Sequence, residues 1–541
     1  MQMAPKNPFK KFSLFDADAP RAVNWLILLA LAIAFYLAYS GHAAAPGADR
    51  PHPEGWFGWA DQGEYLKAAK AFARMEFGPQ VYLPGYSLTA VPFVWAGLED
   101  PFALVNVACF LLFFWFFLEF GKSYVGWLPS LLVVGASLFW VPELMQLWVE
   151  PWTTSLVAPL YAWLFLQWER SRKDGGPAGR GRVVAMGLVG GAVLCTRPPE
   201  AVILVPYFVA FLALQLVTGS RTGNLPAAVR NCVLLVIAGL LGVAFFLGSN
   251  LVMHGNVLGY YVQQPTTSNG FNAMDLAEKL VSLFLDAGAL YLSGEDAILR
   301  RLPWLALGVP AFFYVLWYGP STLRILVVTI LLQLAIYACF VDLLPTGVWM
   351  YHNIHYFKWM IPFIGLIALA ALFDVVRSST PRRRRVAYLG FCAVAWALLS
   401  ARIVLIDETR VWKASFTSSQ RQGVHLIAPG TGGWLDLVYL ESLHGSFHQS
   451  YFGFKNRVVV DGVELRYLFD FRFLPAPSGV RLMFVRPVFA KEVLIEPKEL
   501  AFAAEPLRIR VFHYRFGLGR PAWIGRYVQK IKTSTTAAVE G

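Results

Sequence analysis

The sequence is poor in charged residues. Only 15% of its 541 residues are Asp, Glu, Lys or Arg, whereas a soluble protein of ordinary composition has about 25%. Hydrophobic residues make up 57% of the chain, and the mean hydropathy is +0.51. A water-soluble core cannot bury an apolar excess of this size. The composition therefore excludes a soluble enzyme, a disordered protein and a fibre.

Cysteine is scarce as well. The five cysteines all lie within apolar runs, and no two of them form a CxxC pair: Cys109, Cys195, Cys232, Cys339 and Cys392. We interpret them as small buried hydrophobic residues, because neither a disulfide framework nor a metal site has this pattern.

Repeated apolar runs are the main feature that is present. Runs of about 20 residues are typical of helices that cross a membrane. The sequence therefore predicts a polytopic α-helical membrane protein with about 11–13 transmembrane helices. We expect spans near 24–40, 101–120, 128–147, 151–168, 183–197, 198–217, 229–250, 303–318, 322–341, 356–374 and 386–406. Pro84–Gly97 is short and contains Pro92, so we expect it to be re-entrant or half-spanning.

The basic residues indicate the orientation of these spans. The net charge of +12 comes largely from short loops between apolar runs, and such loops stay in the cytoplasm. The amino terminus, loop 169–182 and the run Arg382–Arg385 are therefore predicted to be cytoplasmic. The long loop 41–83 and the carboxyl-terminal region then lie outside. We expect a multi-pass protein of a bacterial inner (plasma) membrane, with its first apolar run kept as an anchor and with no nucleic-acid partner.

The carboxyl-terminal part has a different pattern. Arg457–Phe471 alternates apolar and polar residues around Asp461-Gly462, which is a hairpin-turn pair. We expect a membrane domain over 1–406, an extracytoplasmic, mainly β domain over 407–532 and a flexible tail over 533–541.

The outer loop 41–83 is the first candidate site. It carries Asp61, Glu64 and Tyr65, and the Pro-Gly-Tyr segment that contains Tyr86 follows it. Carboxylates beside aromatic rings suit carbohydrate, since rings stack on sugars and a carboxylate can accept a proton from a hydroxyl. The alternative is a solvated loop with interfacial Trp and Tyr anchors.

Two further candidates lie at the ends of apolar runs. Glu150 precedes Pro151, and an ionisable residue at this depth is costly and is a functional candidate. A carboxylate that reaches the interface is the alternative. Arg197 precedes two prolines and could bind a phosphate, or Arg197 and Glu200 could simply neutralise one another.

The remaining candidates are polar residues between apolar runs, which we predict to contact substrate: His254, Asn256, Arg300, Arg301, His352, His355 and Lys358. His352 and His355 are three residues apart, but two ligands are too few for a metal site. Together with Lys358 they could instead neutralise a phosphate.

The order of these motifs resembles a known family. Asp61-Gln62-Gly63-Glu64-Tyr65, Pro84-Gly85-Tyr86, Glu150-Pro151, the glycine-rich 187–191 before Arg197-Pro198 and the His-Gly-Asn segment follow one another over residues 20–375. This arrangement resembles the GT-C superfamily of integral-membrane glycosyltransferases. The most similar branch contains protein mannosyltransferases and the transferases that decorate lipid A or cell-wall glycans. The β domain resembles the outer-face domains of some members.

The resemblance implies a reaction and its partners. The donor would be a sugar linked through phosphate to a polyprenyl chain, and an acceptor glycan, glycolipid or protein would be modified at the outer face among membrane lipids. Asp61 would be the base of an inverting transfer, Glu150 the second acidic residue, and Arg197 or Lys358 the phosphate-binding residue. A divalent metal (Mg or Mn) could assist the departing phosphate. The chain has Pro-Gly-Tyr-Ser where members often have Pro-Gly-Tyr-Pro.

Other functions share parts of this pattern. A flippase or transporter of lipid-linked sugars would also need many spans and intramembrane charges, although the sequence has no clear repeated halves, which transporters often have. A glycan polymerase would use a similar donor. A non-catalytic assembly subunit would make Asp61 and Glu150 incidental.

Overall fold

The chain forms two compact units. The structure, a computed structural model, describes residues 21–42, 54–58, 60–259, 276–286, 297–340, 348–349, 352–377, 379–416, 423–442, 457–466, 471–476, 479–496 and 507–518. The first unit comprises Met1–Gln264, Trp304–Leu334 and Ile354–Ala395, and the second comprises Pro265–Pro303, Ala335–Asn353 and Trp396–Gly541.

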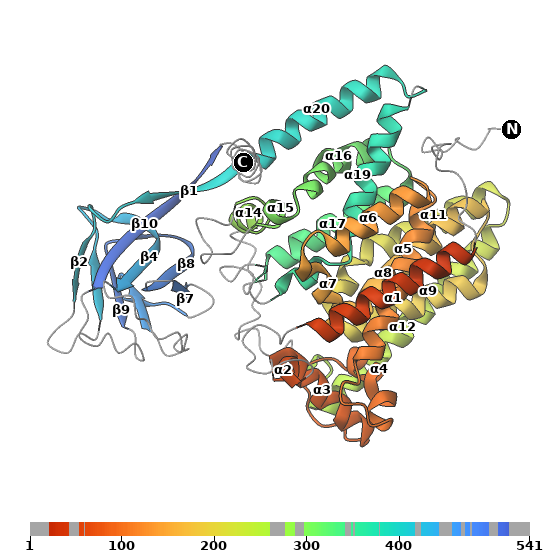
Figure 1. Ribbon diagram of the computed structural model, residues 1–541, viewed down its shortest axis with the longest axis horizontal. Coiled ribbons are helices and arrows are strands. Elements are labelled where there is room, and N and C mark those ends of the chain that lie inside the picture. The colour runs from red at the N-terminus through yellow and green to blue at the C-terminus, as the bar shows by residue number, and fades with distance from the viewer. Residues whose placement is uncertain are drawn as a thin grey trace, which may run out of the picture. The chain divides into compact units, whose positions relative to one another are not determined.

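The first unit is helical. Up to α12 its helices are α1 (Arg21–Gly41), α2 (Glu54–Phe57), α3 (Ala60–Ala73), α4 (Pro84–Trp95), α5 (Ala103–Gly121), α6 (Trp127–Phe139), α7 (Pro142–Val149), α8 (Thr153–Asp174), α9 (Arg180–Thr196), α10 (Pro198–Ile203), α11 (Val205–Arg221) and α12 (Leu225–His254). The later elements are η3 (Pro303–Leu307), α16 (Gly308–Tyr318), α17 (Ser321–Ala338), η4 (Asn353–Phe357), α19 (Met360–Val376) and α20 (Arg382–Leu399). Helix α9 packs along α12, and α5 packs along α8 (Figure 1).

Several of these helices are suited to lipid. Among the described residues, five segments are long and apolar enough to cross a membrane: Val23–Gly41, Ala103–Gly121, Pro198–Arg221, Leu225–His254 and Ser321–Ala338. Large apolar side chains such as Trp25, Val233 and Leu241 are exposed on them. An exposed apolar face is costly in water and favourable in hydrocarbon. The predicted class, a polytopic helical membrane protein with a carboxyl-terminal β domain, is confirmed.

Proline interrupts two segments. The predicted span 128–147 is wrong as a single straight helix, because α6 and α7 meet at an angle of 87°. Pro142 begins α7, and its missing N–H and its ring prevent α6 from continuing through it. Helix α4 has 12 residues with Pro92 inside, which is short for a complete span.

Two glycines set the close approach of α9 and α12. A Cβ atom added at Gly191 would lie 2.7 Å from Cα of Gly242, and one added at Gly242 would meet the backbone of Gly191. Small residues at such a crossing let helix backbones approach closely within a bilayer.

Substitution of Gly242 by Ala is expected to destabilise this crossing. The added methyl group meets backbone, which cannot move aside, so we expect a loss of about 1–3 kcal/mol. The matched control is Gly248→Ala in the same helix, where an added Cβ has no neighbour within 4 Å. The melting temperature in lipid nanodiscs should fall for Gly242→Ala alone; equal values for the two variants would contradict the close contact.

The second unit contains short helices and strands. These are α14 (Leu276–Leu280), η2 (Val281–Leu285), α15 (Ile298–Arg301), β1 (Ala401–Asp407), β2 (Lys413–Phe416), β3 (Val424–Ile427), β4 (Gly433–Ser442), β5 (Arg457–Val460), β6 (Val463–Glu464), β7 (Phe471–Ala476), β8 (Gly479–Ala490), β9 (Glu492–Glu496) and β10 (Leu507–Leu518). The strands pair antiparallel in two five-stranded sheets, ordered β1-β10-β4-β8-β7 and β2-β3-β9-β5-β6.

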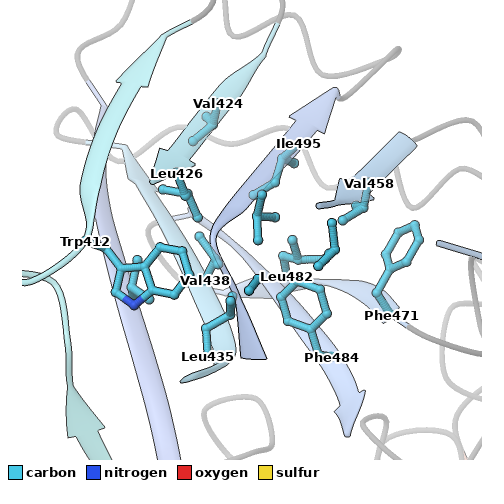
Figure 2. Packing of buried hydrophobic residues seen from close by; sticks show 14 of the residues in the cluster. Trp412, Val424, Leu426, Leu435, Val438, Val458, Phe471, Leu482, Phe484 and Ile495 are labelled. Carbon is cyan, nitrogen blue, oxygen red and sulfur yellow. The ribbon is translucent and has the colours of Figure 1, made fainter. Parts of the chain in front are cut away.

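One apolar core joins the two sheets. Leu435, Val438 and Leu482 come from the first sheet, and Leu426 and Ile495 come from the second (Figure 2). Alternating residues of each strand therefore point into one sandwich core. The predicted hairpin is confirmed, since Val460 pairs with Val463 across the Asp461-Gly462 turn, where both residues have positive φ.

The predicted boundary of the β domain lies too late. Strand β1 begins at Ala401, within the expected span 386–406, because Ala401–Asp407 pairs with β10. Helix α20 already ends at Leu399. The tail 533–541 lies outside the described residues.

Candidate functional site

Asp61 lies in the first turn of α3, in the segment between α1 and α4 of the first unit. The hydroxyl of Tyr82 donates a hydrogen bond of 2.6 Å to its Oδ1. Burial raises the pKa of the Asp61 carboxyl, while the Tyr82 hydrogen bond and the positive charge of Arg197 lower it. The result is a partly buried carboxylate that holds a proton more readily than an ordinary aspartate, as a general base requires.

Aromatic residues surround this carboxylate. Tyr65 lies one turn further along α3, with its ring centroid 4.9 Å from that of Tyr82 and 5.5 Å from that of Tyr86. Tyr86 is fully buried, and its hydroxyl donates 2.7 Å to Oδ1 of Asn106. The amide of Asn106 donates 2.9 Å to the carbonyl of Val149. Tyr86 thus ties α4 to α5 and to the end of α7.

Arg197 separates α9 from α10. Pro198 begins α10 and leaves Arg197 in an extended conformation between the two helices. Its Nη1 donates 2.7 Å to Oγ1 of Thr153, and its guanidinium lies 5.1 Å from the ring centroid of Tyr356. Nε lies 3.8 Å from the carboxylate of Glu200. The alternative pairing of Arg197 with Glu200 is therefore present, but it is longer than the hydrogen bond of Arg197 to Thr153.

Glu200 makes shorter contacts with other residues than it makes with Arg197. It is fully buried and accepts 2.8 Å from the hydroxyl of Tyr161 and 3.1 Å from the amide of Gln333. Gln333 also donates to the carbonyl of Tyr356. This network joins α10 to α8, α17 and η4 beside Arg197.

Three consecutive hydroxyls begin α8, and each contacts a different basic side chain. Thr153 contacts Arg197, Oγ1 of Thr154 lies 3.0 Å from Nδ1 of His355, and Ser155 accepts 2.7 Å from Nζ of Lys358. The amino terminus of a helix carries a partial positive charge and free backbone N–H groups. Three basic groups are thus held at a helix end that itself favours an anion.

Glu150 lies just before this helix and is 0% exposed. Its Oε1 lies 2.7 Å from Nε2 of His42, and its Oε2 accepts 2.8 Å from the indole N–H of Trp152. The ring of Trp152 stacks on His355 with centroids 3.9 Å apart. Glu150 therefore orients the turn that carries the three hydroxyls.

Several of the predicted residues lie together within the first unit: Asp61, Tyr65, Tyr86, Glu150, Arg197, His355 and Lys358. Glu64 is directed toward Lys67, 3.6 Å away. Asn256 and His254 lie at the end of α12, where Oδ1 of Asn256 accepts from the backbone N–H groups of Leu258 and Gly259 and closes the turn.

Arg300, Arg301 and His352 belong to the second unit. The guanidinium of Arg301 lies 4.5 Å from the ring centroid of Trp349 in that unit. These three residues are therefore not assembled with the others within one unit, and their substrate contacts remain a prediction.

Sequence reasoning missed Tyr82, His42 and the hydroxyl run that begins at Thr153. That run follows Glu150-Pro151 and precedes an apolar stretch, which is a helix-start signal. No sequence pattern indicates that His42 and Tyr82 belong to the site, because their partners, Glu150 and Asp61, are distant in sequence. Among the described residues, no group of three or more His, Cys, Asp or Glu lies in a position to hold a metal ion.

Replacement of Glu150 by Ala is expected to destabilise the first unit. It removes the buried oxygens that contact His42 and accept the hydrogen bond of the Trp152 indole, and losing such a buried partner costs about 1–3 kcal/mol. Glu76→Ala is the control, since that carboxylate is exposed and pairs with Arg74. The melting temperature in nanodiscs should fall for Glu150→Ala and stay unchanged for Glu76→Ala; an unchanged value for both would contradict the structural role of Glu150.

Comparison with known proteins gives a distant structural likeness. No family model matches the chain, and no curated protein matches it. Two solved structures of ArnT from Cupriavidus metallidurans, one bound to undecaprenyl phosphate and one in the apo state, are each 13% identical, with a TM-score of 0.43. The match covers 70% of this chain and 65% of the ArnT chain. A likeness of this degree says nothing of the family, substrate or mechanism of this chain.

Proposed function

We propose that this protein is a membrane glycosyltransferase that moves a sugar from a polyprenyl-phosphate-linked donor to a hydroxyl group of an acceptor. The observation that carries the proposal is the convergence at α8. A buried carboxylate, Asp61, lies within the field of Arg197, and Arg197, His355 and Lys358 contact three successive hydroxyls at the start of that helix.

Asp61 acts as the general base. Its carboxylate takes the proton of the acceptor hydroxyl, whose oxygen attacks the anomeric carbon of the donor. The bond between that carbon and the phosphate oxygen breaks, and the phosphate keeps the electron pair. Attack from the face opposite the phosphate inverts the anomeric centre. Tyr82, hydrogen-bonded to Asp61, keeps the carboxylate oriented.

The basic side chains stabilise the leaving group. Charge develops on the phosphate oxygens in the transition state, and fixed cations in a site of low dielectric stabilise it. Arg197 offers a planar fork that suits phosphate, while Lys358 adds a point charge. A divalent metal such as Mg or Mn would add positive charge beside the phosphate; among the described residues no group of three or more His, Cys, Asp or Glu lies in a position to hold one.

A lipid-linked donor suits a protein that is embedded in a membrane. Apolar helices allow the polyprenyl tail to remain in the bilayer among membrane lipids while its phosphate reaches the α8 terminus. The active site and the β domain are proposed to face the outer side of a bacterial inner membrane, where an acceptor glycan, glycolipid or protein is available. A glycan polymerase differs only in transferring a longer chain.

Loss of the Asp61 carboxylate is expected to reduce transfer strongly. One general base contributes about 10²–10⁴ in rate, so Asp61→Asn should lower turnover by that factor while leaving the melting temperature near that of the wild type. The assay follows label from radiolabelled polyprenyl-phosphate sugars to a membrane glycolipid extract, in nanodiscs, with and without EDTA.

The matched control is Asp174→Asn, an exposed aspartate that pairs with Arg182 and should transfer at the wild-type rate. Equal rates for Asp61→Asn and the wild type would remove Asp61 from the role of base. In proteoliposomes, donor that crosses the bilayer without any transfer would identify a flippase instead.

The pH dependence of transfer should respond to Tyr82. The base works only when deprotonated, so activity falls as the pH drops through the pKa of Asp61, which burial raises. The Tyr82 hydrogen bond lowers that pKa, and Tyr82→Phe removes it. The acid limb of kcat/KM should therefore move to higher pH in Tyr82→Phe, while Tyr318→Phe in α16 leaves it in place. A shift toward lower pH, or none, would contradict the assignment.

A further inference from the structure

An aromatic row crosses three neighbouring strands of the first β-sheet. Trp434 of β4 pairs with Phe489 of β8, with ring centroids 5.3 Å apart at 66°. On the other side of Trp434 lies His513 of β10, 6.1 Å away and tilted by only 26°. Trp434 and Phe489 are 49% and 50% exposed. The indole and imidazole rings are thus nearly parallel, the Phe489 ring is steeply inclined to the indole, and together they form an aromatic surface that is partly open to solvent.

A buried carboxylate lies beneath this surface. Asp436 is 0% exposed, and its Oδ2 lies 2.6 Å from Nδ1 of His513. The pairing of β4 with β8 shifts between Leu435 and Leu437, so Asp436 occupies the bulge. Bulges re-aim side chains and are common beside functional sites.

The cost of this arrangement argues for a function. A buried carboxylate is unfavourable unless it is hydrogen-bonded, and an apolar residue would serve the sandwich core better at this position. The contact instead fixes one ring nitrogen of His513 and so sets the orientation of the whole ring. Gly432 allows the Phe489 ring to lie close to the backbone, because a Cβ at this position would lie 2.7 Å from that ring.

We infer that Phe489, Trp434 and His513, supported by Asp436, form a binding site for a carbohydrate of pyranose units. The faces of aromatic rings are electron-rich and complement the C–H hydrogens on one face of a pyranose. The oriented imidazole lies beside the indole and adds a polar group to the aromatic surface, which suits a ligand rich in hydroxyl groups. A surface for lipid or for an apolar protein segment would need neither the histidine nor its buried carboxylate.

The role of this site follows from the proposed function. If the first unit transfers a sugar to a glycan, a second carbohydrate site in the same chain would retain that acceptor between encounters. This role depends on the proposed function, but binding itself needs no donor and no turnover. The two claims can therefore fail separately.

The experiment measures binding of neutral hexasaccharides to the full-length protein in nanodiscs. The probes are cellohexaose, maltohexaose and mannohexaose. Their binding is measured by titration with ligand-observed NMR. We expect at least one probe to bind, and Trp434→Ala to weaken it about tenfold, as removal of a central aromatic anchor does. Trp434→Phe should restore part of the affinity because it restores a ring.

Phe516→Ala is the matched control. Phe516 is 46% exposed on β10, but it lies three residues from His513, so the alternation of the strand places the two side chains on opposite faces of the sheet. This variant should bind like the wild type, as should Asp61→Asn, which tests the proposed function alone. The melting temperature of each variant verifies folding. Absence of binding by all three probes, or equal binding by wild type and folded Trp434→Ala, would overturn the inference.

Discussion

The first unit is organised around the amino terminus of α8. Arg197, His355 and Lys358 come from two segments far from α8 in sequence, and each meets a hydroxyl of the first turn of that helix. The helix end has unsatisfied N–H groups and positive character, and Arg197 adds a guanidinium to it. Under the proposed function, the phosphate of the donor binds here.

The two carboxylates near this helix end have different surroundings. Glu150 is completely enclosed by His42 and Trp152 and holds the preceding turn in place. Asp61 is only partly buried and has a tyrosine hydroxyl as its described hydrogen-bond partner. This difference suits the roles that we propose, with Glu150 holding the turn and Asp61 exchanging a proton with the substrate. Neighbouring carboxylates with contrasting environments commonly divide roles in this way.

The second unit differs from the first in how it places its buried groups. Its core between the two sheets is apolar (Figure 2), and Asp436 is a buried carboxylate of the central strand β4. The β-bulge contains Asp436, whose Oδ2 lies 2.6 Å from Nδ1 of His513, and the exposed Trp434 and Phe489 extend the same row. This row offers aromatic faces to the proposed carbohydrate ligand, whereas the start of α8 offers basic groups to the proposed donor phosphate.

The sequence by itself determined the class of the protein. Composition and apolar runs required membrane helices, because nothing else buries so much apolar surface, and strand alternation with Asp461-Gly462 predicted the β domain and its hairpin. The motif order also singled out Asp61, Glu150 and Arg197. These signals are local, since hydropathy and turn chemistry act over a few residues.

Only the tertiary structure decided which candidates share a site. Arg197 meets Thr153 across 44 residues, and Lys358 meets Ser155 across 203; no local pattern encodes such pairs. The same holds for His42 with Glu150, 108 residues apart, and for the row around Trp434, which depends on strand register. Packing of distant segments sets these contacts, and the alternation of a single strand cannot reveal its neighbours.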